Sequence, residues 1–148
     1  MKRVVVTGIG VVSCLGNNQE EVYQSLLNSK SGITFSEEYK EYNLRSNIHG
    51  IPNIKLEDYV DRKVIRFMGP GSAYNYISMA EAIKDSGLEE KVVSNILTGM
   101  IMGSGGPSIQ NVIFAADKTR EKNPKKNGTI YCPKDYVKYC ISNTSSSF

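Results

Sequence analysis

The chain has 148 residues, of which 40% are hydrophobic, 22% charged and 9% aromatic. This length fits one ordinary domain, and the composition is typical of a globular protein rather than a disordered, collagen-like or coiled-coil one. No run of about 18 apolar residues is present, which excludes a membrane-spanning helix. The formal net charge is +3, but residues 118–148 hold 7 Lys or Arg against 2 Asp or Glu, so the basic character is concentrated there.

The N-terminus is basic and then apolar, as in a signal peptide, but its apolar run breaks at Thr7 and Gly8. No longer apolar region follows. The three cysteines show no paired disulfide framework, which also argues against secretion. We therefore predict a cytoplasmic protein.

Residues 3–12 form a β-branched apolar run, typical of a strand buried on both faces of a parallel sheet. A helix is predicted to start after Asn17 and Asn18, where carboxylates follow a capping residue, and to end before Gly32. Residues 34–58 are polar and show no strong period.

A second helix is predicted near residues 59–68, followed by a third that Ser72 caps and Gly87 ends. The apolar positions expected to face the core are Val60, Val64, Ile65 and Met68 in the second helix, and Tyr76, Met79, Ala80 and Ile83 in the third.

Residues 96–102 form a second buried-strand pattern, and a fourth helix is predicted to start near Ser108. This order indicates a βαβ crossover in which the strands at 3–12 and 96–102 are adjacent and parallel. The predicted fold class is α/β.

Two glycine-rich stretches accompany the predicted strands. Gly8-Ile9-Gly10 falls short of a dinucleotide-binding fingerprint, because Ser13 replaces the third glycine and no strand ending in an acid follows about 20 residues later. We interpret these glycines as allowing tight packing of a central strand. Gly103-Ser104-Gly105-Gly106 lacks the Gly-Lys-Ser/Thr of a phosphate loop. It either borders a ligand crevice or makes a tight turn into a helix.

Cys14, Cys132 and Cys140 have no metal-ligand spacing, and His49 is the single histidine. A Cys–His pair needs an activated thiol and an oriented base, and neither is indicated here. We expect His49 to face solvent or to cap a helix. No metal site is predicted.

Arg62, Lys63 and Arg66 form a basic group on the second predicted helix, where Arg62 and Arg66 lie one turn apart. Such a group suits an anionic partner, such as a phosphate or an acidic protein surface. A solvated helix face explains it equally well.

Six stretches in order resemble the β-ketoacyl-acyl-carrier-protein synthases, and most closely the synthase I group. They are residues 1–13 (MKRVVVTGIGVVS), 15–18 (LGNN), 29–36 (SKSGITFS), 61–68 (DRKVIRFM), 101–106 (IMGSGG) and 114–117 (FAAD). The resemblance covers residues 1–126. It implies part of a thiolase-like fold of two α/β halves, usually a homodimer, that elongates acyl chains by decarboxylative Claisen condensation. A cysteine thioester and two histidines perform this chemistry, and no cofactor is needed.

None of the family's catalytic residues is expected in this chain. The family's nucleophile lies beyond the matched region in a Ser-Ala-Cys-like context, which no cysteine here fits, and His49 matches neither family histidine. The chain is therefore expected to be an inactive N-terminal fragment. Lys63 and Arg66 match residues that contact the acidic carrier protein, and Arg62 lies beside them. Gly106 and Pro107 align with the turn that borders the acyl pocket at the dimer interface.

Residues 127–148 match nothing in that family, and a shifted reading frame of the gene accounts for their Lys-, Tyr- and Ser-rich composition. The alternative function is a non-catalytic module that binds a carrier protein or another synthase chain through the basic helix and exposed sheet. A nucleic-acid-binding role for the basic tail is disfavoured, because aromatic and basic residues are not interleaved on a helix or sheet. We also expect no membrane partner.

Overall fold

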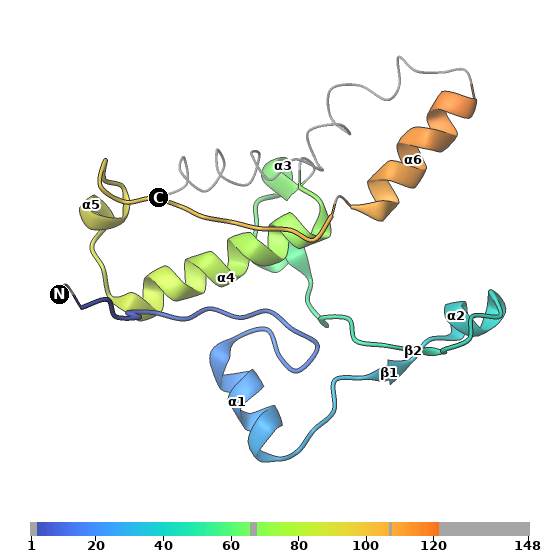
Figure 1. The fold of residues 1–148 in the computed structure, drawn as a ribbon, viewed down its shortest axis with the longest axis horizontal. Coiled ribbons are helices and arrows are strands. Elements are labelled where there is room, and N and C mark those ends of the chain that lie inside the picture. Colours follow the sequence, from blue (N-terminus) through green and yellow to red (C-terminus); the bar gives the residue numbers. More distant parts are fainter. Residues whose placement is uncertain (1–2, 66–67, 107, 122–148) are drawn as a thin grey trace.

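The computed structural model describes residues 3–65, 68–106 and 108–121. In chain order its elements are α1 (Gln19–Leu27), β1 (Thr34–Phe35), α2 (Glu37–Glu41), β2 (Ile48–His49), a 3-10 turn (Leu56–Asp58), α3 (Arg62–Ile65), α4 (Pro70–Ser86), α5 (Glu90–Val93) and α6 (Ile109–Arg120). The long helix α4 lies at the centre of the described chain, with α6 and the β1–β2 hairpin projecting from it in different directions (Figure 1).

The ends of α4 follow from local backbone chemistry. Its first residue is Pro70, with Gly69 as the N-cap residue, rather than the predicted Ser72 cap. Proline suits this first position because its φ is already helical and its missing N–H would have had no partner there. The helix ends as predicted at Gly87, whose φ of 64° is left-handed and therefore favours glycine.

Helices α1 and α6 begin where the sequence predicted them. The Asn18 side chain accepts from the Glu21 N–H at 2.9 Å, while the Glu21 carboxylate accepts the Asn17 N–H at 2.7 Å. Ser108 caps α6 by accepting from the Asn111 N–H. These bonds satisfy N–H groups that have no partner inside a helix.

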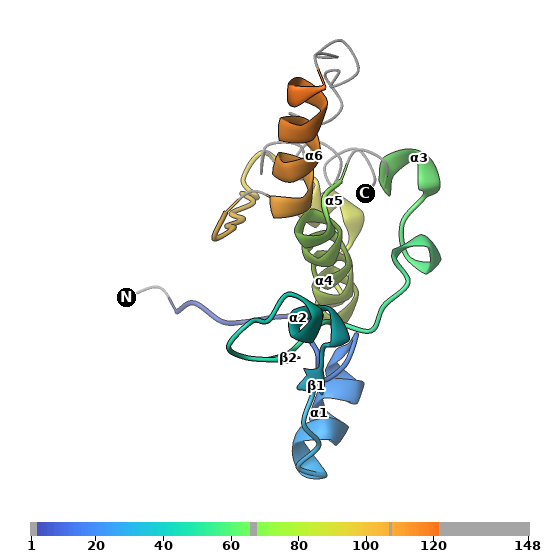
Figure 2. The same ribbon diagram turned by 90° about the vertical axis from the view of Figure 1, so that its right-hand side faces the viewer.

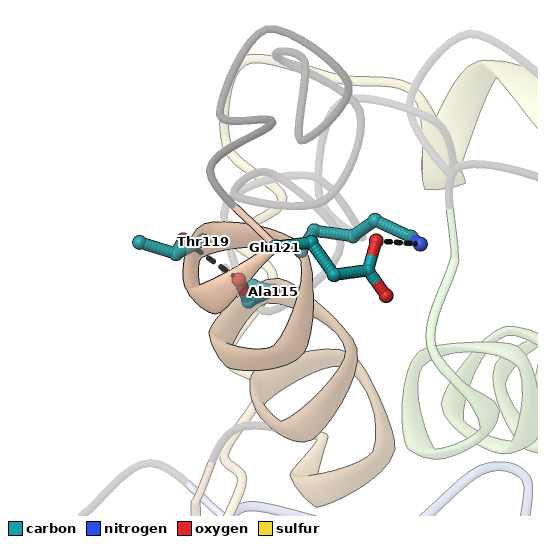
Figure 3. A network of polar contacts seen from close by, with 4 residues as sticks. Ala115, Thr119 and Glu121 are labelled. Atoms are coloured by element: carbon teal, nitrogen blue, oxygen red, sulfur yellow. Dashed lines mark hydrogen bonds and ion pairs between the residues drawn. The ribbon is translucent and has the colours of Figure 1, made fainter.

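The last turn of α6 carries its own polar contacts. The Thr119 hydroxyl donates to the Ala115 carbonyl at 2.8 Å, and Lys118 pairs with Glu121 at 2.6 Å (Figure 3). These contacts join residues of the helix to one another rather than to the rest of the chain.

The predicted irregular region between residues 34 and 58 contains a small hairpin. Thr34 pairs with His49 and Phe35 with Ile48 in an antiparallel register, and the short α2 lies between the two strands. This is the only sheet within the described residues.

The core is small and lies where α3 meets α4. Val60, Met68, Ala73 and Ile77 are the buried hydrophobic residues among those described. Val64, Ile65 and Tyr76 pack against them, which confirms the predicted stripe on the second helix. On α4, Ala73 and Ile77 are buried instead of the predicted Met79, Ala80 and Ile83, which are half-buried.

Residues 3–12 and 96–102 do not pair, which corrects the prediction of adjacent strands. Neither segment is a strand: residues 96–97 lie in a turn closed by the Thr98 N–H and the Asn95 carbonyl. Residues 3–12 and the chain from residue 98 run along α4 in the same direction (Figure 1), with α4 between them in the sequence. No described ladder joins them. A crossover places two parallel strands in one layer without making them neighbours, since consecutive strands are adjacent only about two-thirds of the time.

The glycines of residues 3–12 allow backbone-to-backbone contact with α4. A Cβ on Gly8 would lie 2.1 Å from the Ala82 carbonyl oxygen, and one on Gly10 would lie 1.8 Å from that of Ser78. No other residue fits at these distances. The interpretation of these glycines as packing residues is confirmed, although their neighbour is a helix and not a strand.

Candidate functional site

The basic helix is much shorter than predicted. Its described part, α3, covers four residues (Arg62–Ile65) rather than residues 59–68. Asp61 sets its start: its carboxylate accepts the Lys63 N–H at 2.6 Å, and its carbonyl accepts the Val64 and Ile65 N–H groups at 2.9 Å. The preceding residues form a separate 3-10 turn, Leu56–Asp58.

Arg62 and Lys63 lie exposed on α3, while Val64 and Ile65 turn toward the core. Buried Val60 precedes the helix and anchors it. Neither basic side chain forms an ion pair with another described residue. The helix thus presents two cations that are free to meet an anionic surface. Arg66, the third predicted member, lies outside the described residues.

Gly106 lies in an open loop before α6. Added Cβ atoms at Gly103, Gly105 and Gly106 would meet nothing within 4 Å. The loop is ordered locally by the Ser104 hydroxyl, which donates to the Gly106 carbonyl at 2.7 Å. The described part of the chain forms no wall around this loop. Pro107 lies outside the described residues.

Cavities formed by the described residues lie elsewhere. One, of about 340 Å³, is lined along α4 by residues that include Tyr76, Ala80 and Lys84. Another, of about 400 Å³, lies beside α1 and includes Glu20, Gln24 and Lys30. Neither includes the basic helix or the Gly106 loop.

Cys14 and His49 occupy structural positions. A Cβ on Gly32 would lie 2.4 Å from the Cys14 carbonyl oxygen, and one on Gly50 would lie 3.1 Å from its Sγ atom, so the chain is closely packed around this cysteine. His49 is half-buried on β2 and meets the Tyr39 ring edge-on at 5.4 Å. The prediction that His49 faces solvent or caps a helix is therefore wrong.

Two carboxylates on α4 form long-range hydrogen bonds that were not predicted from the sequence. Asp85 accepts the Ile9 N–H at 3.0 Å, and Glu81 accepts the Val11 N–H at 2.8 Å and the Gln19 N–H at 2.8 Å. The hydrogen bond from the Ile9 N–H, followed by one from the Gln19 side chain, lowers the pKa of Asp85 below its usual 3.8. Their i, i+4 spacing on a predicted helix was the available signal.

No described helix is long and apolar enough to cross a membrane. Within the described ranges, no group of three or more His, Cys, Asp or Glu side chains could hold a metal ion.

Comparison with known proteins defines the class of protein. The family model for the β-ketoacyl synthase N-terminal domain matches residues 1–146. A crystal structure of a β-ketoacyl synthase from Burkholderia phymatum STM815 has a TM-score of 0.81 and 21% identity, covering 99% of this chain and 36% of that one. The ishigamide ketosynthase/chain length factor has the same TM-score at 18% identity, covering 98% and 36%.

The chain therefore belongs to the β-ketoacyl synthase family and has part of its thiolase-like α/β fold, as predicted. It is 48% identical over 120 residues to the 3-oxoacyl-[acyl-carrier-protein] synthase 1 of Haemophilus influenzae, covering 81% of this chain and 30% of that protein. Against the Escherichia coli K12 protein of the same name the identity is 49% over 123 residues, with the same coverage. The chain spans about a third of the length of the curated relatives it matches.

Proposed function

We propose that this chain is part of a 3-oxoacyl-[acyl-carrier-protein] synthase of fatty-acid elongation and contributes the surface that binds the carrier protein. The basic pair Arg62 and Lys63 on α3 carries the proposal, together with the names of the relatives. We include Arg66 in the same surface, on the resemblance of its sequence context. The proposal also includes a cytoplasmic location, which fractionation of expressing cells tests.

The arrangement of α3 suits recognition of an acidic protein. Asp61 and the buried anchor Val60 hold the helix, so its two cations are presented from a fixed backbone. Exposed charges of this kind raise the association rate and select the partner by complementarity, and salt screens their effect. Such a surface binds without performing any chemistry.

Binding of purified acyl carrier protein to the full chain tests this proposal. The variant carrying Arg62→Glu and Lys63→Glu should bind about tenfold or more weakly, because two attractions become repulsions, each worth roughly 0.2–1 kcal/mol at an exposed site. The wild-type affinity should also fall as salt rises from about 50 to about 300 mM, because salt screens the attraction between exposed charges.

Lys40→Glu is the matched control, because Lys40 is exposed on α2 (Figure 1), away from α3. It should bind the carrier protein as the wild type does. Equal weakening per reversed charge in the control and in the double variant would indicate a general charge effect and would contradict a specific surface on α3.

The alternative proposal is a non-catalytic module that binds another synthase chain. The apolar side chains exposed on α6 favour it: Ile109, Val112 and Ile113 are 65%, 44% and 55% exposed. Helix α6 projects away from α4 (Figure 1), and Figure 2 shows α6 above α4 and α1 below it. Because α6 directly follows Gly106 and Pro107, this surface also suits the family's homodimer and its acyl-pocket border. Co-purification with a full-length synthase, lost on Ile113→Asp but not on Lys63→Glu, would support this alternative over the first.

We further propose that residues 1–126 are the synthase portion and that residues 127–148 come from a shifted reading frame. The similar relatives, which cover 81% of this chain, support this boundary, whereas the family model's match extends beyond it to residue 146. The gene's DNA downstream of codon 126 tests this directly. A single inserted or deleted base should restore a family-like continuation, and its absence would overturn the proposal.

A further inference from the structure

We propose that Gln19, Glu81 and Asp85 close one edge of the extended segment around residues 9–11, so that another strand can pair with this segment only at its opposite edge. The carboxylates thereby decide on which side the segment can join a sheet. This inference stands apart from carrier-protein binding, because it concerns a different part of the molecule.

The closed edge is identified by which residues of the segment make these hydrogen bonds. In an extended chain, the N–H and C=O of one residue point to one edge, and those of the next residue point to the other. Ile9 and Val11 therefore share an edge. The Ile9 N–H is bonded to Asp85, the Val11 N–H to Glu81, and the Ile9 carbonyl accepts the side-chain amide of Gln19.

The glycines hold the segment at the distance that these bonds need. Gly8 and Gly10 lie directly against the backbone of α4 at Ala82 and Ser78. Glu81 precedes Ala82 on the helix, and Asp85 lies one turn further on, so both carboxylates extend from the contact surface to the neighbouring N–H groups. The close packing of the two glycines on α4 and the hydrogen bonds from the segment to the two carboxylates therefore depend on each other.

Glu81 also ties the segment to α1. Its second oxygen accepts the Gln19 N–H at the first residue of that helix, and the Gln19 side chain returns to the Ile9 carbonyl. One carboxylate thus joins α4, α1 and the extended segment. Such a junction resists the displacement that an incoming strand at this edge would require.

The opposite edge is open. The backbone N–H and C=O groups of Gly8, Gly10 and Val12 have no hydrogen-bond partner among the described residues. Unpaired groups on an apolar extended segment are a template for strand addition. The segment is therefore prepared for pairing on one side only.

Amide hydrogen exchange, detected residue by residue by NMR on the full chain, tests this inference. In the wild type, the Ile9 and Val11 amides should exchange about tenfold or more slowly, relative to their intrinsic rates, than those of Gly8 and Gly10. Asp85→Ala should remove the protection of Ile9 and leave that of Val11. Glu81→Gln should remove protection at Val11 or Gln19, because one amide oxygen cannot replace two carboxylate oxygens.

Glu90→Gln, on α5, is the matched control and should change none of these rates. The exchange rate of the Ile77 amide in the core shows whether a variant has lost protection only at the segment or has unfolded as a whole. If Glu81→Gln unfolds the chain, the change in the Ile9 exchange rate in Asp85→Ala still tests the proposal. Equal protection of Gly10 and Val11 in the wild type would overturn the proposal, and so would unchanged Ile9 exchange in Asp85→Ala.

Discussion

Substituting Gly10 by alanine should strongly destabilise the packing of residues 3–12 on α4. The new Cβ would lie 1.8 Å from the Ser78 carbonyl oxygen and 2.8 Å from the Ala82 nitrogen. An ordinary carbon–oxygen contact is about 3.3 Å, so the two backbones must separate by about 1.5 Å. With the Glu81 side chain kept in its present rotamer, that shift would stretch the Val11–Glu81 hydrogen bond from 2.8 Å to as much as about 4.3 Å, beyond bonding range.

The free energy of unfolding should fall accordingly. Overpacking typically costs about 1–3 kcal/mol, and a clash with helix backbone, which has no rotamer to change, belongs at the upper end of that range. With a urea slope near 1.5 kcal/mol/M, the midpoint of the helical circular dichroism signal should fall by about 2 M, or the transition should be lost.

Gly71→Ala, within α4, supplies the control. A Cβ there would meet nothing within 4 Å, and alanine is favoured over glycine in a helix by up to about 1 kcal/mol. This variant should be as stable as the wild type or more stable. A Gly10→Ala protein that unfolds at the wild-type midpoint would refute the close backbone contact, as would equal losses in both variants.

Three further predictions concern pH, association and activity. Hydrogen bonding lowers the pKa of Asp85 below 3.8, so the stabilising contribution of this carboxylate is complete above that ordinary value and is lost as the pH falls through the lower folded value. The protection factor of the Ile9 amide should therefore stay constant from pH 6 to 8 and fall below about pH 4. In Asp85→Asn it should not depend on pH. The purified chain should self-associate and bind a hydrophobic dye, because apolar side chains in residues 4–9 and 96–101 are largely exposed; a monodisperse monomer with a single cooperative transition in sedimentation and melting experiments would contradict this. The chain should not condense acyl- and malonyl-carrier protein, and Cys14→Ser should change nothing catalytic, because the family's nucleophile context is not found among its cysteines; product detected by mass spectrometry from the wild type would overturn the expectation.

The features that the sequence predicted well depend on a few neighbouring residues. Asn18 and Ser108 cap their helices through bonds to N–H groups three residues away, and Gly87 ends α4 through its own φ. The family followed from ordered stretches of sequence, which the comparison with known proteins confirmed. Arg62 and Lys63 are exposed, as on the solvated helix face that the sequence allowed, although Val60 and Met68 of the predicted stripe lie outside α3.

What surrounds residues 3–12 was decided by the tertiary structure. A β-branched apolar run indicates an extended, packed segment, but it does not name the neighbour, because hydrogen bonding between distant segments leaves no local trace in the sequence. Here the neighbour of Gly8 and Gly10 is the backbone of α4, and the partners of Ile9 and Val11 are carboxylates more than 60 residues away. Residues 96–102 likewise lie on the far side of α4 in the sequence from residues 3–12 and do not pair with them in the described structure, which the two apolar patterns alone could not indicate.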